Sequence, residues 1–177
     1  HWFTIGHENA HSLGPKEGSE KLGKYRNIIE ENKADMGALA FVDLLMKLGM
    51  YTPHQRTQII VTTIADNFLK SKPTMSQAHR VRTVMQNKYF AERGAYTITK
   101  EGKIFVNIDK VVPIAKEMLA EIVRIQIDGD FNKAEKYVQD NFVWTDNMEI
   151  IAKKLQKVSK ALNGRLETEL ADKLLSE

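Results

Sequence analysis

Apolar residues recur at helical spacing along most of this chain, and glycine or proline separates the segments in which they do so. At Gly14-Pro15, for example, glycine lets a helix close and proline prevents it from continuing. The pattern predicts a mainly helical fold. The helices predicted in this way span about residues 1–13, 24–48, 52–70, 75–93, 109–127, 131–142, 146–162 and 166–175.

One segment does not follow the helical spacing of apolar residues. Residues 95–108 are rich in β-branched and aromatic residues, which favour strands, and Lys100-Glu101-Gly102 can turn between two of them. We therefore expect a mainly α fold, a multi-helix domain with one small β-hairpin at about residues 95–108. A chain of 177 residues with 42% apolar residues can bury a core, so residues 1–177 are expected to form a single helical domain.

The composition excludes several kinds of site. The chain has no cysteine, so a metal would have to be held by imidazole and carboxylate groups, and the redox compartment stays open. Lysine and arginine exceed aspartate and glutamate by only three, and the charges are interspersed. No apolar stretch is long enough to span a bilayer. We therefore expect neither a nucleic-acid partner nor a membrane partner.

The segment His7-Glu8-Asn9-Ala10-His11 matches the pattern H-E-x-x-H. Histidines four residues apart on a helix lie on one face, so both imidazoles can bind the same metal ion. Glu8 projects about 100° around the helix from His7. It is therefore placed to act as a general base, accepting a proton from a water that zinc has acidified. The pattern can also arise by chance, so the two imidazoles alone are modest evidence.

Carboxylates that could complete the site follow in the next predicted helix. Gluzincin peptidases take their third zinc ligand from such a helix, and here Glu31 follows His11 with nineteen residues between them. Asp35 lies one turn beyond Glu31 and could accept a hydrogen bond from the outer nitrogen of a ligating histidine. The combination predicts a site for one zinc ion.

The segment Glu30-Glu31-Asn32-Lys33-Ala34-Asp35 resembles the motif E-E-x-x-A-(E/D) of the dipeptidyl peptidase III metallopeptidases. Further along, Gln77-Ala78-His79 on a predicted helix, the hairpin, and the helix ending at Asp128-Gly129-Asp130 are also similar to the C-terminal region of that family. The resemblance therefore covers most of the chain. One departure is the five-residue H-E-x-x-H, since most members have a six-residue H-E-x-x-x-H.

The resemblance implies a zinc-dependent peptidase with dipeptidyl-peptidase-like (aminopeptidase) activity on a peptide substrate. The chain would be the C-terminal part of the zinc-binding lobe, and because it does not begin with Met, an upstream region of the same polypeptide is expected to be missing. A cytoplasmic location is expected, and a removed upstream signal is left open. The implied residues are the zinc ligands His7, His11 and Glu31, the catalytic Glu8, the ligand-orienting Glu30 and Asp35, and His79 as a substrate or transition-state contact.

Alternatives remain open at this stage. His79, Arg82 and Gln86 share the polar side of the predicted helix 75–93, where a lone histidine is often only solvated and Arg82 could bind a peptide carboxylate or be exposed. The chain could also be a non-catalytic helical binding or regulatory domain that keeps a vestigial or structural metal motif. The fragment itself could be inactive if the ends of its first helix fray.

Overall fold

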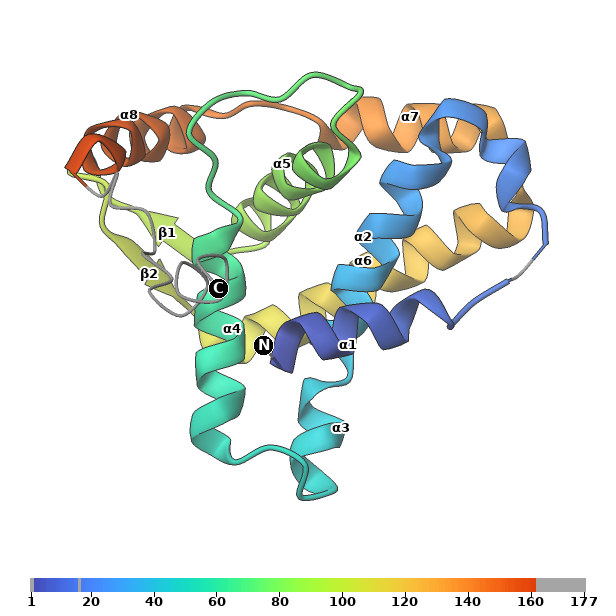
Figure 1. Ribbon diagram of the computed structural model, residues 1–177, viewed down its shortest axis with the longest axis horizontal. Helices are drawn as coiled ribbons and strands as arrows, with labels where there is room; N and C mark the ends of the chain where they lie inside the picture. Colours follow the sequence, from blue (N-terminus) through green and yellow to red (C-terminus); the bar gives the residue numbers. More distant parts are fainter. Residues whose placement is uncertain (1, 16, 162–177) are drawn as a thin grey trace, which may run out of the picture.

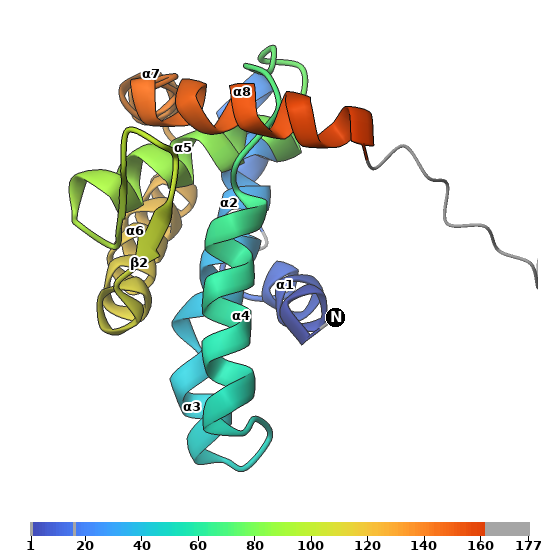
Figure 2. The same ribbon diagram turned by 90° about the vertical axis from the view of Figure 1, so that its left-hand side faces the viewer.

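The computed structural model describes residues 2–15 and 17–161 of the chain, and it confirms the mainly α fold with one small hairpin. The predicted helix at 166–175 lies outside the described residues. Figure 1 shows α7 and α8 at one end of the molecule and α3 at the other, and Figure 2 shows the same order from the side. The elements are α1 (Trp2–His11), the 3-10 helix η1 (Ser19–Tyr25), α2 (Arg26–Ala40), α3 (Val42–Lys47), α4 (Pro53–Asp66), α5 (Ala78–Glu92), β1 (Tyr96–Ile98), β2 (Ile104–Val106), α6 (Ile108–Asp128), α7 (Phe131–Asn141) and α8 (Asp146–Ala161).

Local signals explain several helix ends. Thr52 caps α4 in a reciprocal capping box with Gln55, as the Thr52-Pro53 pair predicts. The side chain of Asp130 accepts hydrogen bonds from the first backbone amides of α7. Gly129 ends α6 with a φ of 57°, a left-handed conformation that glycine adopts without steric cost.

Several predicted helix boundaries are wrong. The helix expected at 52–70 ends at Asp66. The helix expected at 24–48 is divided at Phe41 into α2 and α3. In α3, the Oδ1 atom of Asp43 lies 2.5 Å from the Nε atom of Arg56 in α4. The helix expected from residue 75 begins at Ala78, because the preceding residues form a turn in which the Thr74 amide donates to the side chain of Gln77. In the last two places a contact outside the periodic pattern accompanies the change: an ion pair between side chains at Asp43, and a hydrogen bond from backbone to side chain at Thr74.

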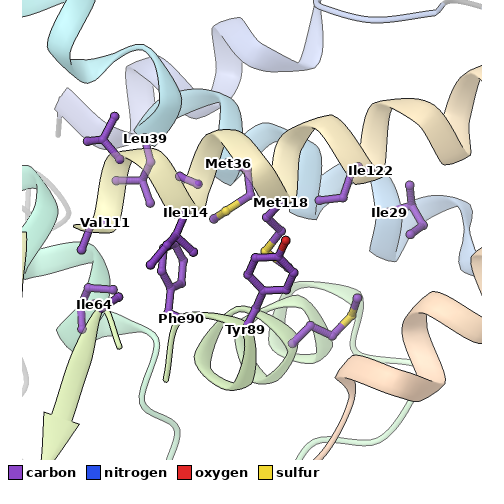
Figure 3. Close-up of a cluster of buried hydrophobic side chains, with 14 of the residues drawn as sticks. Ile29, Met36, Leu39, Ile64, Tyr89, Phe90, Val111, Ile114, Met118 and Ile122 are labelled. Carbon is purple, nitrogen blue, oxygen red and sulfur yellow. The ribbon is translucent and has the colours of Figure 1, made fainter. Parts of the chain in front are cut away.

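The core forms around α2, which contacts α1, α5 and α6. Figure 3 shows side chains of α2, α5 and α6 pointing toward one another, with Phe90 of α5 beside Ile114 of α6 and Tyr89 beside Met118. The hairpin β1–β2 is antiparallel, and Tyr96 pairs with Val106. Within the described residues, no helix has both the length and the apolarity needed to cross a membrane. The fully buried core side chains labelled in Figure 3 include Ile29, Met36, Leu39, Tyr89, Phe90, Met118 and Ile122.

Small residues let α1 approach α2 closely. A Cβ atom added to Gly37 would lie 2.7 Å from the Cβ of Ala10, and one added to Gly6 would lie 3.2 Å from the Cβ of Ala38. Because neither glycine carries a side chain, the two helix backbones come closer than larger residues would allow. This contact places the histidines of α1 directly beside the carboxylates of α2.

Candidate metal centre

Two neighbouring helices bring together the three side chains that the sequence predicts as ligands. His7 and His11 lie one turn apart on α1, and their Nε2 atoms are 3.1 Å apart. The Oε2 atom of Glu31, on α2, is 3.5 Å from the Nε2 atom of His7. The candidate ligand atoms of all three residues lie within 4.8 Å of one another.

The outer nitrogens of both histidines face carboxylates. His7 Nδ1 is 2.7 Å from Oδ1 of Asp35, and His11 Nδ1 is 3.0 Å from Oε1 of Glu30. An ionised carboxylate only accepts hydrogen bonds, so each Nδ1 carries the proton and each Nε2 is left with a lone pair. When both rings are neutral, the two Nε2 lone pairs face each other, and their repulsion is relieved by a cation between them, either a metal ion or a proton on one Nε2 atom.

A zinc ion fits this donor set. Bonds of about 2.0–2.1 Å in a tetrahedral site place two donors about 3.3 Å apart. Two of the three donor separations, 3.1 Å and 3.5 Å, lie on either side of that value, and the third is at most 4.8 Å. In addition, Glu31 Oε2 is buried and has no hydrogen-bond partner. The Nδ1 atom of His79 is 3.0 Å away, but this contact does not have the geometry of a hydrogen bond.

The electrostatic surroundings keep His7 in the form that binds a metal. Burial lowers the pKa of His7, and the positive charge of Arg82 lowers it further. Three neighbouring carboxylates, Glu31, Glu8 and Glu30, act in the opposite direction but do not outweigh these effects. The neutral imidazole is therefore favoured, and it is this form that donates its lone pair to a metal.

Asp35, which contacts His7, is held in turn by α5. Its Oδ2 atom accepts hydrogen bonds from Arg82 Nη1 and, at 2.9 Å, from Gln86 Nε2. The same Gln86 amide donates to Asn32 at 3.0 Å, while its Oε1 atom accepts from Asn67 at 2.9 Å. Asp35 and Gln86 are almost completely buried, so this hydrogen-bond network is closed to water.

Glu30, which contacts His11, is held by different partners. Lys33 Nζ is 2.8 Å from Oε1 of Glu30, and Gln126 Nε2 of α6 donates to Oε2 at 2.7 Å. Lys33 also donates to the backbone carbonyls of His11 and Leu13, which fastens the end of α1 to α2. Burial alone would raise the pKa of Glu30, but the hydrogen bonds from Lys33 and His11 outweigh it, so that pKa lies below its usual value.

The two residues predicted to act on substrate lie at the solvent side of the site. Glu8 is exposed on α1, next to His7. The side chain of His79 is 70% exposed, and its Nδ1 atom contacts Glu31. His79 and Glu31 both line a cavity of about 390 Å³, whose other lining residues are Asn27, Ser76, Gln77, Ala78 and Arg80.

Sequence reasoning missed the residues that hold the two carboxylates. Arg82 was expected to be exposed or free to bind substrate, and Gln86 to lie on a polar outer face, but both face α2. A hint was available, since His79, Arg82 and Gln86 are spaced three and four residues apart and form one stripe along a helix. Nothing in the linear sequence pointed to Gln126.

No family model matches the chain. Among solved structures it is similar to DPP III from Caldithrix abyssi, with a TM-score of 0.78 and 25% identity over 88% of this chain and 32% of that one. It is also similar to dipeptidyl-peptidase III from Corallococcus sp. strain EGB, with a TM-score of 0.81 and 23% identity over 88% of this chain and 31% of that one. Among curated proteins, a plant protein, Nudix hydrolase 3 of Arabidopsis thaliana, is 23% identical over 98% of this chain and 24% of its own length.

The two solved structures confirm the resemblance to dipeptidyl peptidase III. The chain has the fold of part of that peptidase. It spans about a third of the length of the two solved structures and about a quarter of the plant relative.

Proposed function

We propose that this chain, which resembles part of dipeptidyl peptidase III, forms the zinc site of a metallopeptidase. His7, His11 and Glu31 would hold one zinc ion. The observation that carries the proposal is the pair of Nε2 atoms 3.1 Å apart, each on a ring whose Nδ1 faces a carboxylate. Glu30 and Asp35 would keep the two rings in the orientation that binds the metal.

Glu8 is the proposed general base. Zinc, when bound, would polarise the carbonyl of a peptide bond and lower the pKa of a water molecule to about 7. Glu8 is the residue after the ligand His7 on α1, and its carboxylate is exposed. In this position it would accept a proton from that water. When the C–N bond breaks, Glu8 returns the proton to the departing amine.

His79 is the proposed contact for the substrate. Its imidazole is exposed beside the ligand Glu31 and lines the cavity of about 390 Å³, which can admit part of a peptide. A hydrogen bond from this ring to the substrate carbonyl would stabilise the negative charge that develops on the oxygen. Release of dipeptides from the N-terminus of a peptide is the specificity suggested by the resemblance. Such a specificity also requires a group that binds the free N-terminal amine of the substrate, which a longer polypeptide could supply.

The test combines metal analysis with hydrolysis of a dipeptidyl substrate, in this chain and in any longer natural polypeptide that contains it. We expect about one zinc per chain in both wild type and Glu8→Gln, and a loss of activity of about 10² to 10⁴-fold in the variant. Glu17→Gln is the control, because Glu17 is also exposed but lies outside α1. Full activity in Glu8→Gln contradicts the catalytic assignment. Zinc binding without hydrolysis by any wild-type form favours a structural metal site instead.

A further inference from the structure

A single guanidinium group on α5 contacts two carboxylates of the candidate metal centre. Arg82 Nη1 donates to Oδ2 of Asp35, and Arg82 Nε lies 3.8 Å from Oε2 of Glu31. The side chain of Arg82 is only 17% exposed, so these interactions are shielded from water. Arg82 Nε and Glu31 Oε2 are both buried without a hydrogen-bond partner, so their opposite charges face each other directly.

The contact with Asp35 restricts how that carboxylate can turn. Oδ1 of Asp35 faces His7, while Oδ2 accepts from both Arg82 and Gln86. Rotating the carboxylate would separate it from two buried donors, which is costly when no water can replace them. The donors from α5 therefore keep Oδ1 directed at the imidazole of His7.

We propose that Arg82 is a positioning residue of the metal centre: from α5 it aligns one imidazole ligand, through Asp35, and one carboxylate ligand, Glu31. This inference rests on the proposed zinc site. It adds that the affinity for zinc depends on a third helix that contributes no ligand. Arg82 acts through its neighbours, since its own side chain cannot bind a cation.

The direction in which zinc affinity changes when Arg82 is replaced distinguishes positioning from a simple effect of charge. A positive guanidinium near the site repels Zn²⁺, so if charge alone mattered, removing Arg82 would strengthen zinc binding. If positioning dominates, removing it frees Asp35 and Glu31 to move, and zinc binding weakens. Loss of a residue that orients a metal ligand commonly costs about 10- to 100-fold in metal affinity.

The experiment measures zinc affinity by competition with a chelator and the visible absorption of the Co²⁺-loaded chain, which reports ligand geometry. Arg82→Met removes the charge and the donors but keeps much of the volume. Arg93→Met is the matched control, because Arg93 also ion-pairs at α5, with Glu117 at 3.1 Å, away from the centre. We expect a loss of about 10- to 100-fold in zinc affinity and an altered Co²⁺ spectrum for Arg82→Met only.

A second comparison isolates the route through Asp35. Because Arg82 acts on His7 through Asp35, Arg82→Met should weaken zinc binding less in an Asp35→Asn chain than in wild type. Unchanged or tighter zinc binding in Arg82→Met overturns the proposal. So does full additivity of the two substitutions.

Folding is monitored by the thermal unfolding of the metal-free chain. If Arg82→Met does not fold, Arg82→Lys is measured in its place. Lysine keeps the positive charge but lacks the planar guanidinium group, whose separate nitrogens reach two carboxylates. Weaker zinc binding by a folded Arg82→Lys supports positioning, and wild-type affinity overturns it. If the wild-type chain itself binds no zinc, it is the proposed function that fails.

Discussion

The two histidines of the candidate metal centre have the same chemistry but different surroundings. His7 and its partner Asp35 are 11% and 1% exposed, whereas His11 and Glu30 are both 30% exposed. We call these pairs, with the residues that hold each carboxylate, the buried arm and the open arm. The buried arm ends on Arg82 and Gln86 of α5, and the open arm on Lys33 of α2 and Gln126 of α6.

The difference shows two ways in which neighbouring helices can hold an imidazole beside a carboxylate. In the buried arm, Arg82 can only donate, and Gln86 is held in its donor orientation because its Oε1 atom already accepts from Asn67. This arrangement is therefore rigid and intolerant of change. The open arm can adapt, because water reaches it and because the Oε1 atom of Gln126 is buried without a partner. Rotating that amide would offer an acceptor in place of a donor. Three substitutions test this contrast.

The largest effect is expected from Gly37→Val, which acts on both arms together. A Cβ atom at position 37 would lie 2.7 Å from Ala10, so α1 must move away from α2 and carry both histidines with it. We expect a destabilisation of about 1–3 kcal/mol, as for other overpacked sites. Zinc binding should weaken more than with either arm altered alone.

Thermal unfolding and chelator competition measure both effects of Gly37→Val. Ala120→Val is the control, because Ala120 lies on the exposed side of α6. Wild-type zinc affinity in Gly37→Val would show that the close contact between α1 and α2 does not set the geometry of the site.

A smaller effect is expected from Asp35→Asn, which alters only the buried arm. The asparagine amide can accept from His7 through its oxygen, but its nitrogen then meets the donors of Arg82 and Gln86. We expect a loss of about 10- to 100-fold in zinc affinity, typical of a changed partner of a metal ligand. Isothermal titration of the metal-free chain measures it. An unchanged affinity would mean that Asp35 does not orient His7.

The smallest effect is expected from Glu30→Gln, the matching change in the open arm. The new amide oxygen can still accept from His11, and its nitrogen can donate to Gln126 once that side chain turns over. Zinc affinity should therefore fall by less than about 10-fold. The same titration measures it. A loss equal to or larger than that of Asp35→Asn reverses the ranking and removes the proposed distinction between the arms.

The sequence predicts much of the fold and the candidate ligand set because these depend on local spacing. Helical periodicity and the Thr52-Pro53 and Gly129 signals identify most helices, although the break at Phe41 follows from contacts that no local pattern contains. The H-E-x-x-H spacing puts two imidazoles on one face, and Asp35 was proposed as a partner from its position one turn after Glu31. Glu30 and His79 came from the family resemblance alone.

The amino-acid sequence by itself determined most of the described helices, the hairpin and the residues of the candidate metal centre, because these depend on spacings of a few residues along the chain. Only the tertiary structure decided that His7 faces Asp35, that His11 faces Glu30, and that α5 and α6 hold these carboxylates. Arg82 lies 47 residues after Asp35, and Gln126 lies 96 residues after Glu30. Contacts of this range depend on how whole helices pack, which for α1 and α2 rests on glycines at their crossing.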